Sequence, residues 1–206
     1  MLRRWIEERL PRRMLPEGRW SHLADPYDGD EVVVLDCETS VFDKKRGELL
    51  SVAAVRVRGN QIRLTEALDL TIRSDAVTDP KAVRVHYLRR EDRMEGVALA
   101  EAIEKLLDFI GNRPICGFYI EYDRAILNRY IRELYNFKLP NRFIEVSEIY
   151  VKSKRRHHIH EVHLDLTFEG LARDLQVPIV ERHTALGDVI STALMYIKLT
   201  GFGPPR

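Results

Sequence analysis

The sequence predicts an α/β fold in which a mixed sheet packs against helices, and three observations support this prediction. Residues 32–35, VVVL, form an apolar run with the length of a buried strand. Residues 49–73 alternate apolar with polar side chains on both sides of Gly59-Asn60, which predicts two further strands joined as a hairpin. Helical periodicity then alternates with short strand-like runs, an order typical of helices packed on the faces of a sheet.

The elements after the hairpin are predicted from spacing and helix ends. The first helix has its apolar residues at i, i+3, i+4 and i+7, namely Ile103, Leu106, Leu107 and Ile110, and Gly111 follows where a helix ends. Residues 114–120, PICGFYI, predict a strand. The next helix ends before Pro140, and its apolar face consists of Ile126, Leu127, Tyr130, Ile131 and Leu134.

Three more elements complete the predicted domain. Residues 142–146, RFIEV, predict a fifth strand. The stretch TFEGLARDL predicts a helix that begins at an N-cap, Thr167, and stops before Pro178. The last helix, DVISTALMYIKL, ends at Gly201, and its predicted apolar face consists of Ile190, Ala193, Leu194 and Ile197.

Length, composition and charge limit the class of protein. With 206 residues and 45% hydrophobic content, the chain can bury one core of ordinary domain size and still carry an extension. Lysine plus arginine total 33 against 32 acids, so binding to a polyanion would depend on local patches of charge. No apolar run is long enough to span a membrane. Cys37 and Cys116 lie in apolar stretches, which predicts reduced core thiols in a cytoplasmic protein.

Residues 1–28 are interpreted as a basic N-terminal extension, which leaves residues 29–206 as one domain. The extension contains arginine pairs, Pro11 and Pro16, and the turn-rich stretch ADPYDGD marks its boundary. In one interpretation it is an arm that packs on its own domain, with Trp5, Ile6 and Leu10 on one face of a short helix. In the other it is an arginine-rich contact with nucleic acid or a partner protein.

Two carboxylates follow the first strand with one residue between them. Side chains two apart on a strand share a face, so Asp36 and Glu38 point the same way while Cys37 turns into the core. Carboxylates placed together repel one another and acquire raised pKa values unless a cation lies between them. A divalent metal ion would supply that charge. The alternative is surface salt bridging of the two acids.

Two more acids occur where the chain enters a helix. Asp123 lies in GFYIEYDRAIL, in the first turn of the helix that follows a predicted strand, and Asp188 lies at the head of the last helix. Either acid alone would be interpreted as a helix cap. His183, five residues before Asp188, adds an imidazole that can accept a proton. Together, the three junctions indicate hard oxygen ligands beside a general base.

The three stretches VVLDCETS, GFYIEYDRAIL and RHTALGD, the last followed by STALMYIKL, resemble in order and spacing the exonuclease motifs of the DEDD superfamily, histidine subclass. Within it they are most similar to the family of the DNA polymerase III epsilon proofreading subunit, over roughly residues 30–203. The resemblance implies a ribonuclease H-like exonuclease fold with a central five-stranded mixed sheet. It also implies a metal-dependent 3′-to-5′ exonuclease that releases nucleoside 5′-monophosphates.

The same resemblance assigns roles to individual residues. Asp36, Glu38, Asp123 and Asp188 would hold two Mg²⁺ or Mn²⁺ ions, and His183 would be the general base. The main chain at Thr39 would seat the terminal 3′-hydroxyl, and His86 matches a family position near the substrate.

Some positions depart from the family pattern. Phe118 and Tyr119 stand where the family commonly has histidine and asparagine, so Phe118 either stacks on substrate or packs internally. Tyr87 and Arg89 stand where glycine and threonine are usual, which puts substrate positioning in doubt.

Residues 152–163, KSKRRHHIHEVH, form a second concentration of basic and histidine residues. A solvated loop is the first interpretation. The second is a phosphate-binding loop beside the active cleft. A zinc site is a third interpretation, but no cysteine accompanies the histidines.

Three functions remain open at this stage. The first is an exonuclease acting on DNA 3′ ends in proofreading or repair, and the second is a 3′-to-5′ exoribonuclease acting on short or 3′-terminal RNA. The third, a non-catalytic module that binds nucleic acid or a polymerase, is disfavoured because all five expected catalytic residues are present. The chain ends soon after the last predicted helix, so a segment for docking a polymerase or replication partner would be the N-terminal extension.

Overall fold

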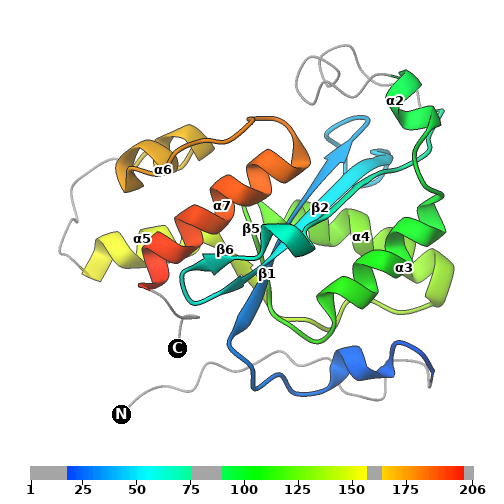
Figure 1. Cartoon of the computed structure of the whole chain (residues 1–206), viewed down its shortest axis with the longest axis horizontal. Coiled ribbons are helices and arrows are strands. Elements are labelled where there is room, and N and C mark those ends of the chain that lie inside the picture. Colours follow the sequence, from blue (N-terminus) through cyan, green and yellow to red (C-terminus); the bar gives the residue numbers. More distant parts are fainter. Residues whose placement is uncertain (1–17, 76–89, 157–163, 202–206) are drawn as a thin grey trace.

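The computed structural model describes residues 18–75, 90–156 and 164–201, and it shows a mixed sheet between two layers of helices (Figure 1). The strands are β1 (Glu31–Thr39), β2 (Leu49–Arg58), β3 (Gln61–Ile62), β4 (Leu68–Thr71), β5 (Ile115–Gly117) and β6 (Phe143–Glu145). Their order is β3-β2-β1-β5-β6, and β4 also pairs with β2. The antiparallel β1–β2 pair and the parallel β1–β5 and β5–β6 pairs confirm the predicted mixed sheet.

The helices divide into two groups. Figure 1 shows α3 and α4 on one side of the sheet and α5, α6 and α7 on the other. Their bounds are η2 (Ser21–Ala24), η3 (Leu64–Glu66), α2 (Arg90–Met94), α3 (Leu99–Ile110), α4 (Ile120–Tyr135), α5 (Val146–Arg156), α6 (Phe168–Leu175) and α7 (Ala185–Thr200). None of the helices in the described ranges is both long enough and apolar enough to cross a membrane.

The predicted hairpin around Gly59-Asn60 is present, but its second strand is divided. Gly59 adopts a φ of 58° in the turn, and Val57 pairs with Ile62 across it. The chain then leaves the ladder through η3, where Glu66 and Ala67 donate their amides to the carbonyls of Arg63 and Leu64. It rejoins β2 as β4, opposite residues 51–54. Local turn bonds therefore replace the middle of the predicted strand.

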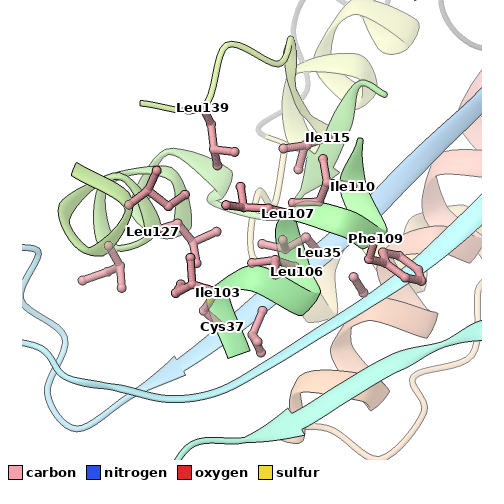
Figure 2. Close-up of a cluster of buried hydrophobic side chains, with 14 of the residues drawn as sticks. Leu35, Cys37, Ile103, Leu106, Leu107, Phe109, Ile110, Ile115, Leu127 and Leu139 are labelled. Carbon is pink, nitrogen blue, oxygen red and sulfur yellow. The ribbon is translucent and has the colours of Figure 1, made fainter. Parts of the chain in front are cut away.

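Strand β1 lies between two apolar cores. Val33, Leu35 and Cys37 belong to the core on the side of α3 and α4, and Figure 2 shows Leu35 and Cys37 among side chains of those helices. Val32 and Val34 belong to the second core, with residues of α5, α6 and α7. Because side chains alternate along a strand, the acids that follow Val34 at even positions face the α7 side.

The predicted helix ends are confirmed. Thr167 and Thr184 are the N-caps of α6 and α7, and their hydroxyls accept hydrogen bonds from the amides of Gly170 and Gly187. Gly111 follows α3 with a positive φ of 54°, which favours glycine.

Two predicted apolar faces are only partly correct. Ile190, Leu194 and Ile197 are each only partly buried, whereas Val189 is fully buried. Helix α7 packs on β1 and β2, and its buried side includes residues spaced i, i+3, i+4 and i+7, namely Val189, Thr192, Ala193 and Tyr196. On α4, Leu134 is 39% exposed, so it lies at the margin of the predicted face.

The basic segment 152–163 is not a loop over its whole length. Residues 152–156 form the last turns of α5, where Lys154 pairs with Asp174 of α6 at 2.5 Å. Residues 157–163 lie outside the described residues, as do Trp5, Ile6 and Leu10.

The part of the N-terminal segment that is described packs on the domain. Trp20 is 6% exposed and its ring meets Tyr135 edge-on at 6.0 Å. Arg19 donates to Glu104 at 2.8 Å and to Asp108 at 2.6 Å, both on α3. Residues 18–24 thus lie against the α3–α4 side of the molecule.

Candidate active site

Three of the four predicted acids meet at one end of β1. One carboxylate oxygen from each of Asp36, Glu38 and Asp188 lies within 4.8 Å of the others. Asp36 and Glu38 come from β1 and are partly buried, and Asp188 comes from the first turn of α7 and is buried. The hard oxygen donors of this cluster are the kind that Mg²⁺ and Mn²⁺ prefer.

Asp123 approaches the same end of β1 from the opposite side. It lies in the first turn of α4 and is 3% exposed. Burial raises its pKa, and the charge of Asp36 raises it further, while the thiol and main-chain amide of Cys37 act in the opposite direction. Asp123 thus contacts Cys37, the residue between Asp36 and Glu38, and it lies outside the three-acid cluster.

The electrostatics of the metal-free cluster disfavour its full ionisation. Burial, followed by the charge of Asp188, raises the pKa of Asp36 to about 7. Burial, followed by the charges of Asp36 and Asp188, raises the pKa of Glu38 to about 9. The pKa of Asp188 is also raised by burial, although Arg182 lowers it. A divalent cation among these groups would favour their charged forms.

We expect the metal-free protein to lose stability as pH rises between about 4 and 9. In this range the folded protein binds more protons than the unfolded chain, because the raised pKa values belong to the folded state. The midpoint of thermal unfolding in a chelator should therefore be lower at pH 8 than at pH 5, and Mg²⁺ should reverse the loss at pH 8. The variant Glu38→Gln should show a smaller pH dependence. A metal-free stability that is flat or rises across this range would contradict the expectation.

The loop before α7 has a tight backbone that requires glycine. The amide of Gly187 donates to the hydroxyl of the N-cap Thr184 at 3.0 Å, and the amide of Asp188 donates to the carbonyl of Thr184 at 2.9 Å. A Cβ on Gly187 would lie 2.3 Å from the carbonyl oxygen of Glu181 and 2.4 Å from that of Val180. Close contact between this helix start and the preceding loop therefore fixes where residues 181–183 lie.

His183 occupies that loop in a left-handed conformation, with φ at 69°. Its main-chain amide donates to Oδ1 of Asp188 at 3.4 Å, and its side chain is partly exposed. The histidine that was predicted as general base thus adjoins the acidic cluster. Its catalytic role stays a prediction.

Arg182 was not singled out in the sequence, yet it contacts the cluster directly. Its guanidinium donates to Oδ2 of Asp188 and, at 2.9 Å, to Oε1 of Glu169, and it lies 4.1 Å above the ring of Phe168. Its positive charge lowers the pKa of Asp36. The sequence shows Arg182 beside His183 in RHTALGD. It does not show the ion pair, because Glu169 lies 13 residues away, on α6.

The remaining predicted contacts have different outcomes. Thr39 is 8% exposed, follows an irregularity in the β1–β2 register, and shares a hydrogen bond of 2.7 Å with the hydroxyl of Tyr122. Phe118 packs edge-on against Phe168 at 5.2 Å, as its packing interpretation expects. His86 lies outside the described residues.

A second feature that the sequence analysis did not single out is an exposed aromatic ring beside the site. Phe42 is 83% exposed, and its ring stacks on Tyr122 with centroids 4.3 Å apart and an interplanar angle of 14°. Tyr122 directly precedes Asp123 in α4. Phe42 follows Glu38 by only four residues, but strand β1 ends at Thr39. The alternation of buried and exposed side chains along the strand therefore does not predict that Phe42 is exposed.

Comparisons with known proteins identify the class. The exonuclease family model RNase_T matches residues 33–196. The chain is 23% identical over 170 residues to the DNA polymerase III subunit epsilon of Aquifex aeolicus, covering 81% of this chain and 79% of that protein. It is 30% identical over 139 residues to the oligoribonuclease of Streptomyces griseus, covering 61% of this chain and 69% of that protein.

Solved structures share the fold. Escherichia coli exonuclease I in complex with a dA16 oligonucleotide superposes with a TM-score of 0.70 at 13% identity, and the match covers 84% of this chain but 41% of that chain. Exonuclease X in complex with 5′ overhanging duplex DNA superposes with a TM-score of 0.62 at 18% identity, covering 82% of this chain and 91% of that chain. This chain therefore spans less than half of exonuclease I.

The sheet and its two helical layers define a ribonuclease H-like exonuclease fold. The chain belongs to the exonuclease family, in the class of 3′-to-5′ exonucleases of the DEDD type. Enzymes of this class depend on divalent metal ions, and the acidic cluster fits that dependence.

Proposed function

We propose that the protein removes nucleotides from DNA 3′ ends and releases nucleoside 5′-monophosphates, in proofreading or repair. The observation that carries this proposal is the meeting of Asp36, Glu38 and Asp188 within 4.8 Å, and the contact of Asp123 with Cys37 between the first two acids adds to it. The names of the structural neighbours support a DNA substrate, because exonuclease I and exonuclease X were solved with DNA.

The donor set fits two divalent ions. Asp36, Glu38 and Asp188 would hold one Mg²⁺ or Mn²⁺, and Asp123 together with Asp36 would hold the other. When bound, such ions activate water and offset the negative charge that develops on the phosphate and the leaving 3′ oxygen. The raised pKa values of Asp36 and Glu38 support this assignment, because burial and mutual repulsion of the acids outweigh the single positive charge of Arg182.

The protein's own groups supply positioning and proton transfer. In our proposal, the imidazole of His183 accepts the proton of the attacking water, since its loop places it next to Asp188. The main chain at Thr39 would seat the terminal 3′-hydroxyl, and the hydrogen bond between Thr39 and Tyr122 holds that segment against α4. Phe42 would contact the terminal base, because its exposed ring is already supported by Tyr122.

A second candidate is a 3′-to-5′ exoribonuclease that acts on short or 3′-terminal RNA. It is favoured by the similarity to the oligoribonucleases of Streptomyces griseus and of Mycobacterium sp., the latter 29% identical over 192 residues. The two candidates share the metal cluster and differ in how the pocket treats the 2′-hydroxyl.

A matched digestion tests both candidates. DNA and RNA oligonucleotides of the same sequence, single-stranded and duplex, would be incubated with Mg²⁺ or Mn²⁺ and scored for direction and product. We expect 5′-monophosphates released from the 3′ end, with DNA degraded faster. Faster RNA degradation would establish the second candidate, and no hydrolysis of either would reject both.

Two further aspects belong to the proposal. Cys37 and Cys116 are both buried, free thiols, which supports function in the reducing cytoplasm. The similarity to a DNA polymerase III epsilon subunit supports association with a polymerase or replication partner, which co-purification with the host's replicative polymerase would test.

We expect removal of Arg182 to increase affinity for divalent cations. Arg182 already places one positive charge against Asp188, so a metal ion must compete with it. The variant Arg182→Gln should bind Mn²⁺ several-fold to roughly tenfold more tightly in a calorimetric titration. A tenfold change in affinity corresponds to about 1.4 kcal/mol of binding free energy. Arg19→Gln removes the same charge far from the cluster and should leave the affinity unchanged. Equal or weaker binding by Arg182→Gln would show that Arg182 does not compete with the ion.

A further inference from the structure

The loop between β1 and β2, residues 40–48, carries three consecutive basic residues a few positions after Asp36 and Glu38. Lys44, Lys45 and Arg46 are all exposed, and the side chain of Arg46 is 82% exposed. Among the described residues, neither lysine ammonium forms an ion pair, and Asp43 is the acid that pairs with Arg46, at 3.1 Å. The loop therefore presents three exposed basic side chains against two acids, Asp43 and Glu48.

The loop is held in one conformation by its own hydrogen bonds. The carboxylate of Asp43 accepts the amides of Lys45 at 2.8 Å and Arg46 at 3.1 Å. The amide of Gly47 donates to the carbonyl of Asp43 at 2.7 Å. A Cβ on Gly47 would lie 2.5 Å from the carbonyl oxygen of Val41, so the close return of the chain depends on glycine.

Arg129 of α4 anchors the main chain of this loop. Its guanidinium donates to the carbonyl oxygens of Lys44 at 3.2 Å and Lys45 at 2.6 Å, and also to that of Gly47. It further donates to the hydroxyl of Tyr130 at 3.0 Å. Because the guanidinium binds the inward-facing carbonyls, the main chain is anchored while the lysine side chains stay exposed.

The loop is also joined to the elements of the active site. Its first residues follow Glu38 and Thr39 on β1, and the hydroxyl of Tyr122 donates to the carbonyl of Val41 at 3.1 Å. Tyr122 lies next to Asp123 in α4 and stacks on Phe42. The basic residues thus lie a few positions along the chain from Glu38. Their loop is held by α4, the helix that also carries the candidate metal ligand Asp123.

We propose that Lys44, Lys45 and Arg46 bind the phosphodiester backbone of a single-stranded nucleic acid upstream of the nucleotide being removed, and that Arg129 is the positioning residue for this contact. This inference rests on the proposed exonuclease function. Phosphate contacts of this kind give affinity without sequence preference and depend strongly on salt. A fixed main chain lowers the entropy lost when the side chains bind.

Binding of a fluorescent oligothymidylate, measured by anisotropy in EDTA over a range of salt concentrations, tests the proposal. The double variant Lys44→Gln/Lys45→Gln should weaken binding by roughly tenfold and reduce the salt slope by about 1.4, because each contact to a single strand contributes about 0.7. The double variant Lys105→Gln/Lys198→Gln removes two exposed lysines from other elements and should bind like the wild type. Equal weakening in both double variants, or an unchanged salt slope in the first, would overturn the proposal.

Arg129→Met separates positioning from charge. It should accelerate amide hydrogen exchange over residues 43–47 and weaken binding severalfold, while the salt slope stays near that of the wild type because all three basic residues of the loop remain. Unchanged binding with faster exchange would reject the positioning role.

Hydrolysis of a minimal substrate distinguishes failure of this inference from failure of the proposed function. The p-nitrophenyl ester of thymidine 5′-monophosphate has no upstream phosphate, so the Lys44→Gln/Lys45→Gln variant should hydrolyse it at the wild-type rate and lose efficiency only on longer oligonucleotides. If the wild type fails to hydrolyse either substrate, the proposed function is wrong. If the variant matches the wild type on the longer oligonucleotides as well, the loop inference alone is wrong.

Discussion

Replacing Asp188 by asparagine is expected to reduce hydrolysis of a 3′ end by roughly a thousandfold or more while the protein stays folded. A thousandfold loss corresponds to about 4 kcal/mol of transition-state stabilisation, the scale of a lost electrostatic contact in a catalytic site. Asp188 is 6% exposed and shares the cluster with Asp36 and Glu38. Replacing it by asparagine therefore removes one of the three carboxylates of the cluster. The rate would be measured on a labelled oligonucleotide with saturating Mg²⁺.

The fold of this variant should survive because asparagine preserves the shape of the side chain and removes one of several crowded negative charges. Far-ultraviolet circular dichroism and a cooperative thermal transition in EDTA would verify this. Asp108→Asn is the matched control: Asp108 is an exposed acid on α3 that pairs with Arg19. It should retain full activity. Near-normal turnover by Asp188→Asn would refute the assignment of the cluster to the metal ions.

Replacing His183 by alanine is expected to lower the rate of hydrolysis by roughly a hundredfold to ten-thousandfold, the usual contribution of a general base. Binding of Mn²⁺ should be unchanged, since the main-chain amide of residue 183, not its ring, contacts Asp188. Added imidazole should restore part of the rate. These three results together distinguish proton transfer from a purely structural role.

His22→Ala supplies the control for this second prediction. His22 lies in η2, and the Nδ1 atom of its ring contacts the carbonyl oxygen of Arg19 at 2.9 Å, on the α3 side of the molecule. Its replacement should leave hydrolysis unaltered. An active His183→Ala enzyme, or one that has lost Mn²⁺ binding together with activity, would remove His183 from the role of base.

The features that were predicted correctly depend on local rules. The shared face of Asp36 and Glu38 follows from the alternation of side chains along β1. The caps at Thr167 and Gly111 follow from hydrogen-bonding needs at helix ends. Each rule involves residues a few positions apart, so the sequence alone carries the necessary information.

The features that were missed or wrong depend on contacts between distant segments. The ion pair of Arg182 with Glu169 requires α6 and α7 to be packed together, and the anchoring of Lys44 by Arg129 joins residues 85 positions apart. The buried face of α7 was misjudged because apolar residues occur on more than one side of this helix, so periodicity alone does not show which side packs on β1 and β2. The last turns of α5 were taken for a loop because their basic residues lack apolar spacing.

The most direct measurement of the central claim is an anomalous difference map from crystals of the protein soaked in Mn²⁺. The account predicts peaks bounded by the carboxylates of Asp36, Glu38 and Asp188, with Asp123 bordering the second ion. A protein that digests oligonucleotides but shows manganese only elsewhere, with these carboxylates bare, would contradict the account.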